Sequence, residues 1–153
     1  MMQNRRAEFC TARASHMDGI MEIERASFSD PWSLSFFLNL LDDPNAYCIV
    51  CLEQGEILGY YVLYAVLDEG EIFNIAVLPR HRGQSIGALM LEHCLAQGQA
   101  QKLCKMHLEV RAGNTAAIGM YKGAGFIAAG FRRGYYTHPK EDAIIMTYNY
   151  EET

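Results

Sequence analysis

Residues 73–95 constrain the fold most, because a strand, a basic loop and a helix follow one another there without a gap. Residues 73–78 are mostly apolar and include β-branched side chains, which is typical of a buried strand. Pro79 ends this strand, since proline has no N–H to donate to a sheet ladder. Residues 80–87 form a short basic loop with two glycines, and from Ile86 the apolar residues recur at helical spacing. The order predicts a strand, a tight turn and a helix.

A basic loop that leads into a helix is a candidate anion-binding site. The N–H groups in the first turn of a helix have no internal partners and lie at the positive end of the helix dipole. Arg80 and Arg82 add positive charge, so a phosphate or pyrophosphate is the natural ligand. The alternative is an ordinary turn with two solvated arginines. A P-loop is excluded because Gly-Lys-Ser/Thr is missing, and a dinucleotide fingerprint fits poorly because no Gly-x-Gly pair opens the helix.

Residues 82–87, Arg-Gly-Gln-Ser-Ile-Gly, resemble the Arg/Gln-x-x-Gly-x-Gly/Ala pyrophosphate loop of the GNAT superfamily of N-acetyltransferases. Ser85 replaces the central glycine of that pattern; it keeps the backbone N–H but loses the free access of glycine to positive φ. The resemblance implies that this loop binds acetyl-CoA and that the preceding strand pairs with its pantetheine arm. The residues so implied are Ile75, Ala76, Val77, Arg82, Gly83, Gln84, Ser85, Ile86, Gly87 and Ala88.

Length, composition and charge narrow the class of protein. The 153 residues suffice for a core of their own, and we expect a single domain over residues 1–153. Half of the residues are hydrophobic and 20% are charged, as in a globular protein. The net charge of -5 argues against nucleic-acid binding, which depends on neutralising phosphates. The longest apolar run, residues 58–67, is far too short to span a membrane.

The start of the chain and the cysteines indicate the compartment. Residues 1–9 lack the apolar segment of a signal peptide. The five cysteines are an odd number for a disulfide framework, so we expect reduced thiols and a cytoplasmic location. Cys48 and Cys51 have Cys-x-x-Cys spacing, but three residues along a strand place side chains on opposite faces. We therefore expect no redox or metal site there, and the scattered histidines suggest none elsewhere.

The pattern of apolar residues and turn signals predicts an α/β fold with a mixed, mostly antiparallel sheet. Ser15 and Ser33 are the expected N-caps of the first two helices. The chain order matches the GNAT fold, in which two central strands splay apart to admit acetyl-CoA. The expected strands are residues 8–12, 47–52, 57–67, 71–78, 105–110, 126–131 and 143–150, and the expected helices are 16–26, 33–41, 86–100 and 114–122.

Acyl transfer from a thioester to an amine needs a polarised carbonyl, a neutral amine and a proton for the departing thiolate. Glu109 alternates with the apolar residues of its strand and is the candidate base; the alternative is a solvated glutamate paired with Arg111. Tyr121 is the candidate acid, and the alternative is a core tyrosine whose hydroxyl finds a protein partner. Asn114 lies seven residues before Tyr121 and shares its helix face.

Residues 108–126 resemble the signature of bacterial ribosomal-protein-alanine N-acetyltransferases (RimI type), Leu-Glu-Val-Arg-x-x-Asn-x-x-Ala-x-x-x-Tyr-x-x-x-Gly-Phe. Residues 28–33, 73–77, 132–136 and 141–146 resemble the same family. The resemblance implies that Glu109 is the general base, that Tyr121 is the general acid and that Asn114 contacts acetyl-CoA. The implied substrate is the N-terminal alanine amine of small-subunit ribosomal protein number eighteen.

Two aromatic pairs are expected to flank the channel for this peptide, namely Phe28 with Trp32 and Tyr135 with Tyr136. The alternative for these four residues is packing at a sheet edge. We expect a monomer that associates weakly, if at all, with other proteins. Two other functions remain open from the residues alone: acetylation of a lysine or small-molecule amine, and binding of acyl-CoA without catalysis.

Overall fold

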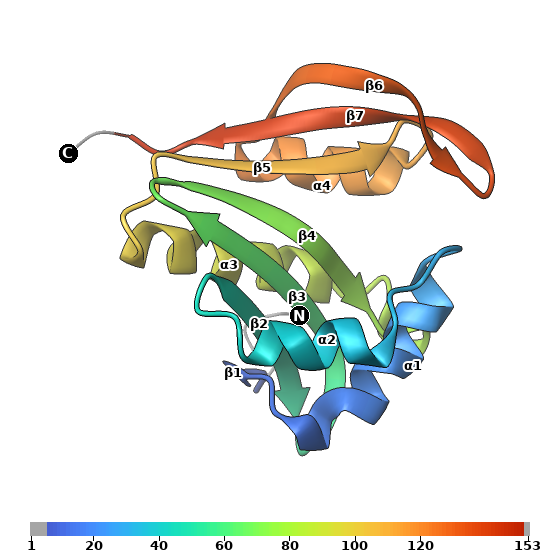
Figure 1. The fold of residues 1–153 in the computed structure, drawn as a ribbon, viewed down its shortest axis with the longest axis vertical. Helices are drawn as coiled ribbons and strands as arrows, with labels where there is room; N and C mark the ends of the chain where they lie inside the picture. The colour runs from blue at the N-terminus through green and yellow to red at the C-terminus, as the bar shows by residue number, and fades with distance from the viewer. Residues whose placement is uncertain (1–5, 152–153) are drawn as a thin grey trace.

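The computed structural model describes residues 6–151, which form one seven-stranded sheet with two helices on each face (Figure 1). The strand order is β1-β2-β3-β4-β5-β7-β6, and only the β4–β5 pair is parallel. The strands are β1 (Glu8–Thr11), β2 (Ala46–Glu53), β3 (Glu56–Val66), β4 (Glu69–Val77), β5 (Lys105–Arg111), β6 (Ile127–Thr137) and β7 (Lys140–Asn149). The helices are α1 (Met17–Ser27), α2 (Leu34–Leu41), α3 (Ile86–Ala100) and α4 (Thr115–Ala124).

The predicted order of elements is confirmed, and most boundaries lie within a few residues of the expected ones. Ser33 caps α2, because its Oγ accepts the Phe36 N–H at 3.2 Å. The expected cap at Ser15 is wrong: a 3-10 turn over Ala14–His16 precedes α1, and His16 stands at the N-cap. Residues 1–5, on which the expectation of no signal peptide partly rests, lie outside the described residues. Within the described part, no helix combines the length and apolar character needed to span a membrane.

Each face of the sheet carries its own apolar core. One core packs the sheet against α1 and α2 and contains Cys48, whereas the other packs it against α3 and α4 and contains Cys51. The two thiols are therefore on opposite faces, as their spacing on β2 predicts. Both are buried, and burial raises the pKa of Cys48 to about 12, so this thiol stays protonated.

The two central strands are paired over only part of their length. Residues Glu69 to Ile72 of β4 pair with Lys105 to Leu108 of β5, and beyond that point the strands diverge (Figure 1). The register between β3 and β4 shifts at the same place, since Leu63 lies opposite Ile72 and Val62 lies opposite Asn74. Phe73 is thus an extra residue in β4, and such a bulge bends a strand and increases its twist. The bend separates β4 from β5.

Candidate active site

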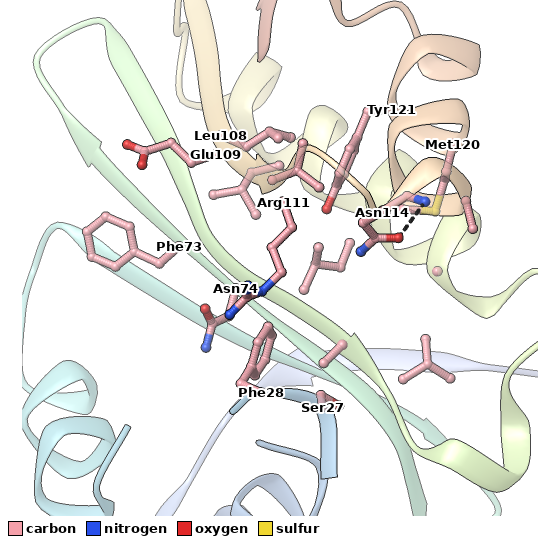
Figure 2. Close-up of a pocket in the computed structure, with 18 of the residues that line it drawn as sticks. Ser27, Phe28, Phe73, Asn74, Leu108, Glu109, Arg111, Asn114, Met120 and Tyr121 are labelled. Atoms are coloured by element: carbon pink, nitrogen blue, oxygen red, sulfur yellow. Dashed lines mark hydrogen bonds between the residues drawn. The ribbon is translucent and has the colours of Figure 1, made fainter. Parts of the chain in front are cut away.

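A cavity of about 1040 Å³ occupies the space between the separated ends of β4 and β5. Its wall comes from the end of α1, the loop after it, β4, the start of α3, β5, α4 and β6 (Figure 2). Two residues that were predicted to contribute to a site, Arg80 and Gln84, do not line this cavity. The predicted residues that do are Phe28, Trp32, Ile75, Ala76, Val77, Arg82, Gly83, Ser85, Ile86, Gly87, Ala88, Glu109, Asn114, Tyr121, Tyr135 and Tyr136.

The two arginines of the basic loop have different positions. Arg82 lines the cavity, and it donates from Nε to the Val77 carbonyl at 3.1 Å and from Nη2 to Ser27 Oγ at 2.9 Å. Arg80 instead pairs with Glu56, and it is not among the cavity-lining residues. The expectation that both arginines add charge to the anion site is therefore wrong for Arg80. Arg82 supplies a fixed cation beside the first turn of α3.

Ser85 adopts the left-handed conformation that the glycine of the family pattern would favour. Its φ is +64° and its ψ is 18°, and its side chain forms no capping hydrogen bond to α3. This conformation costs a non-glycine residue about 1 kcal/mol or more. With Ser85 in this conformation, the start of α3 lies along the cavity.

Replacement of Ser85 by glycine is expected to stabilise the protein by up to about 1 kcal/mol, since it removes this strain and breaks no capping bond. For a chain of this length the midpoint of thermal unfolding should rise by about 2–4 °C. Ser85→Ala is the matched control, because it removes the hydroxyl and keeps the strain. A rise of equal size in both variants would contradict the explanation.

Glu109 has one carboxylate oxygen without a partner. Its Oε1 lies 3.3 Å from Arg132 Nε, whereas its Oε2 is buried and accepts no hydrogen bond from any described residue. Arg111 does not pair with it, so the alternative of a solvated Glu109–Arg111 pair is wrong; Arg111 pairs with Glu141 at 3.2 Å. A buried carboxylate oxygen without a donor is costly and is suited to accept a proton or hydrogen bond from a ligand.

Tyr121 is a core residue that also lines the cavity. Its ring is packed in the core, with the Phe126 ring centroid at 5.7 Å, and the residue is only 6% exposed. Its hydroxyl nevertheless points into the cavity (Figure 2), and no hydrogen bond from it to a described residue is formed. Burial raises the pKa of Tyr121, so the phenol keeps its proton. About two turns earlier, Asn114 caps α4 by accepting the Ala117 N–H at 3.2 Å.

Glu109 and Tyr121 approach the cavity from opposite faces of the sheet. Leu108 and Val110 belong to the core with Tyr121 under α3 and α4, so the alternating Glu109 side chain lies on the α1–α2 face. In Figure 2 the carboxylate of Glu109 and the hydroxyl of Tyr121 point in different directions from β5 and α4. The two groups do not contact each other. Only a ligand that passes through the gap between β4 and β5 can reach both.

The predicted aromatic residues form walls on both sides of the cavity mouth. Phe28 and Trp32 belong to the loop after α1, and Tyr135 and Tyr136 belong to β6. Trp32 is also close to Phe73, with ring centroids 5.9 Å apart in an edge-on arrangement. These residues line the cavity, so they do not pack at a sheet edge alone, and their role in a peptide channel stays a prediction.

Hydrogen bonds connect the two aromatic walls across the mouth. Asp30 Oδ2 lies 3.0 Å from His138 Nδ1, and Arg111 Nη2 donates to Ser29 Oγ at 3.2 Å. Arg111 also lies over the Tyr136 ring, with its guanidinium carbon 4.4 Å from the centroid. The interaction with His138 lowers the pKa of Asp30, which favours the carboxylate form. The loop after α1 and the β6–β7 hairpin thus close one end of the cavity.

Several polar residues that line this cavity were not predicted as site residues, among them Glu24, Glu71 and Asn74. Burial, together with the neighbouring Glu109, raises the pKa of Glu71. Glu24 offered a signal, since it is a charged residue on the apolar stripe that Ile20 and Ile23 define on α1. No metal site was expected, and residues 6–151 contain no group of three His, Cys, Asp or Glu side chains that could hold a metal ion.

Comparisons with known proteins agree with this geometry. A model of the Acetyltransferase (GNAT) family matches residues 17–126. The [ribosomal protein bS18]-alanine N-acetyltransferase of Escherichia coli K12 is 39% identical over 127 residues, which cover 81% of this chain and 84% of that protein. The enzyme of the same name from Haemophilus influenzae is 31% identical over 137 residues, which cover 87% of this chain and 92% of the relative.

A crystal structure of the ribosomal-protein-S18-alanine N-acetyltransferase from Escherichia coli superposes with a TM-score of 0.88 at 31% identity, covering 96% of both chains. The similarity extends over nearly the whole fold. The chain therefore belongs to the acetyltransferase (GNAT) family, within the group of the ribosomal-protein-alanine N-acetyltransferases.

Proposed function

We propose that this chain, acting as one domain over residues 1–153, transfers the acetyl group of acetyl-CoA to the N-terminal alanine amine of ribosomal protein bS18. We further propose that it works as a monomer in the cytoplasm. The names of the relatives support the substrate. One observation of this chain carries the reaction: a gap through the sheet has an unpartnered carboxylate oxygen of Glu109 on one face and the Tyr121 hydroxyl on the other.

The unpaired part of β4 and the loop before α3 suit the binding of acetyl-CoA. Beyond Ile72, β4 has no strand partner on its β5 side, so the backbone groups of residues 75–77 that do not pair with β3 are open to an extended chain with amide bonds, apart from the Val77 carbonyl, which Arg82 engages. The first turn of α3 and Arg82 suit a pyrophosphate. A Cβ added at Gly83 would meet nothing within 4 Å, which shows that the loop is open toward solvent. Asn114 lies on the same side, at the start of α4.

Acetyl-CoA, when bound, supplies the acetyl thioester that reacts with the amine. We assign to the backbone N–H groups of residues 75–77 the polarisation of the acetyl carbonyl. The amine reacts in its neutral form, and as the C–N bond forms and the C–S bond breaks, Glu109 Oε2 accepts the proton that the nitrogen loses, directly or through one water. Tyr121 Oη donates its proton to the departing sulfur and regains one from solvent. Phe28, Trp32, Tyr135 and Tyr136 hold the peptide and exclude water.

The proposal is tested with acetyl-CoA and two peptides in a steady-state assay. One peptide has a free N-terminal alanine, and the other is identical but N-blocked and carries one internal lysine. We expect turnover of the first peptide alone, with kcat/KM levelling off above about pH 8, because an α-amino group titrates at about 7.7–8.0 and a lysine at about 10.4. Turnover of the second alone would favour a lysine acetyltransferase. Tight binding of acetyl-CoA without turnover of either would refute the substrate assignment.

A further inference from the structure

Glu24 is a buried carboxylate for which the proposed reaction has no use. It lies in α1 and is only 1% exposed, inside the apolar layer between the α1–α2 pair and the sheet. No described lysine, arginine or histidine forms an ion pair with it. A buried charge of this kind is tolerated when several hydrogen bonds satisfy it.

Three donors from separate parts of the chain satisfy this carboxylate. Oε2 accepts the backbone N–H of Trp32 at 2.8 Å, and Oε1 accepts both the Tyr60 hydroxyl and Asn74 Nδ2, the latter at 2.8 Å. Burial raises the pKa of Glu24, and these hydrogen bonds limit the rise. Glu24 therefore connects the loop after α1 to β3 and to β4, at the point where β4 bends.

The contact with Asn74 fixes the direction of its amide. Nδ2 faces Glu24 Oε1 and lies 3.4 Å from Tyr60 Oη, so Oδ1 is turned to the other side. That side is the cavity, which Asn74 lines (Figure 2). No donor among the described residues bonds to Asn74 Oδ1. Rotation of the amide by half a turn would bring two oxygens together, because a carboxylate has no proton to donate.

We propose that Glu24 is a positioning residue that orients the Asn74 amide, so that Asn74 Oδ1 accepts a hydrogen bond from an N–H group of the acceptor peptide. This inference rests on the proposed function and extends it to recognition of the acceptor. Asn74 lies beside the bulge at Phe73, on the strand that bounds the gap, and the Trp32 ring lies edge-on to the Phe73 ring. Through its hydrogen bonds, Glu24 thus positions both the Trp32 backbone and the Asn74 amide on the acceptor side, without contacting the acceptor itself.

Substitution E24Q is expected to change the orientation of the Asn74 amide while leaving the packing around residue 24 nearly unchanged. A glutamine side chain has nearly the same shape and still accepts the Trp32 N–H, but its amide nitrogen is a donor toward Asn74. The Asn74 amide then turns its oxygen away from the cavity. We expect E24Q and N74A each to raise the KM for the alanine peptide about tenfold, the usual effect of losing one hydrogen bond. The KM for acetyl-CoA should not change.

The double variant E24Q/N74A tests whether the two residues act as one unit. Because Glu24 acts through Asn74, the double variant should show the same tenfold effect as each single variant. Glu22→Gln is the matched control, since Glu22 is an exposed glutamate two residues away on the same helix. Effects that multiply to about a hundredfold, an unchanged acceptor KM in N74A, or an equal rise in both Michaelis constants would overturn the proposal. If E24Q does not fold, N74A decides.

Hydrogen exchange of the Asn74 side-chain amide provides a readout that does not depend on turnover. In ¹⁵N-labelled wild-type protein its protons should exchange slowly because they are donated to Glu24, and E24Q should speed the exchange at least tenfold while E22Q does not. Equal exchange in all three proteins would overturn the orienting role. If the wild type binds acetyl-CoA but does not acetylate the alanine peptide, the proposed function fails, and this measurement still decides on Glu24.

Discussion

Replacement of Glu109 by glutamine is expected to lower kcat by about 10²- to 10³-fold, as is usual for loss of a general base. Glutamine occupies the same volume and keeps one oxygen, but it cannot take the proton from the amine. The KM for acetyl-CoA should stay within about twofold, since Glu109 lies on the sheet face opposite α3 and α4. Steady-state kinetics with the alanine peptide measure both constants.

The stability of this variant separates a catalytic role from a structural one. Oε2 of Glu109 is buried and has no donor among the described residues, and Oε1 meets only the exposed Arg132, so the carboxylate contributes little to stability. Removal of that charge should leave the unfolding midpoint unchanged or raise it. Glu71→Gln, which changes a second carboxylate of the same cavity, is the matched control and should retain most of the activity. A large loss of stability in Glu109→Gln would count against the assignment.

The sequence predicted the parts of this site whose positions follow from local rules. Alternation along residues 105–110 placed Glu109 on the face opposite the apolar residues, and the strand–loop–helix order placed the start of α3 beside the cavity. The Ser33 cap followed from a serine before an amphipathic run. These rules depend on neighbours within one or two turns, which is why they succeed without knowledge of the fold.

The site predictions that were wrong or missing concern residues whose partners are distant in the chain. Arg80 follows the strand just as Arg82 does, but Glu56 from the β2–β3 hairpin draws it away from the cavity. Glu24 lies on the apolar stripe of α1, but its partner cannot be predicted locally, because only the tertiary structure brings it to Asn74, fifty residues later. The separation of β4 from β5 also depends on the one-residue register shift between β3 and β4 at Phe73, which no local sequence pattern predicts.

Replacement of Tyr121 by phenylalanine is expected to lower kcat by about 10²-fold while the fold stays intact. The phenyl ring preserves the contact with Phe126, and the lost hydroxyl bonds to no described residue, so the free energy of unfolding should change by less than about 1 kcal/mol. Kinetics and thermal unfolding of the same preparation measure both effects. Tyr148→Phe is the matched control, because Tyr148 also packs on Phe126 but lies outside the cavity lining.

The dependence of the rate on pH provides a second test of Tyr121 as the proton donor. Because burial raises the pKa of Tyr121, its proton is available throughout the neutral and mildly alkaline range. The wild-type rate should therefore rise with deprotonation of the acceptor amine, near pH 8, and should not fall again by about pH 9.5. Tyr121→Phe should show the same rise at a uniformly lower level, since the phenol donates its proton after the amine has reacted. A descending limb below pH 9 in the wild type, or more than half of the wild-type kcat in the variant, would require another proton donor.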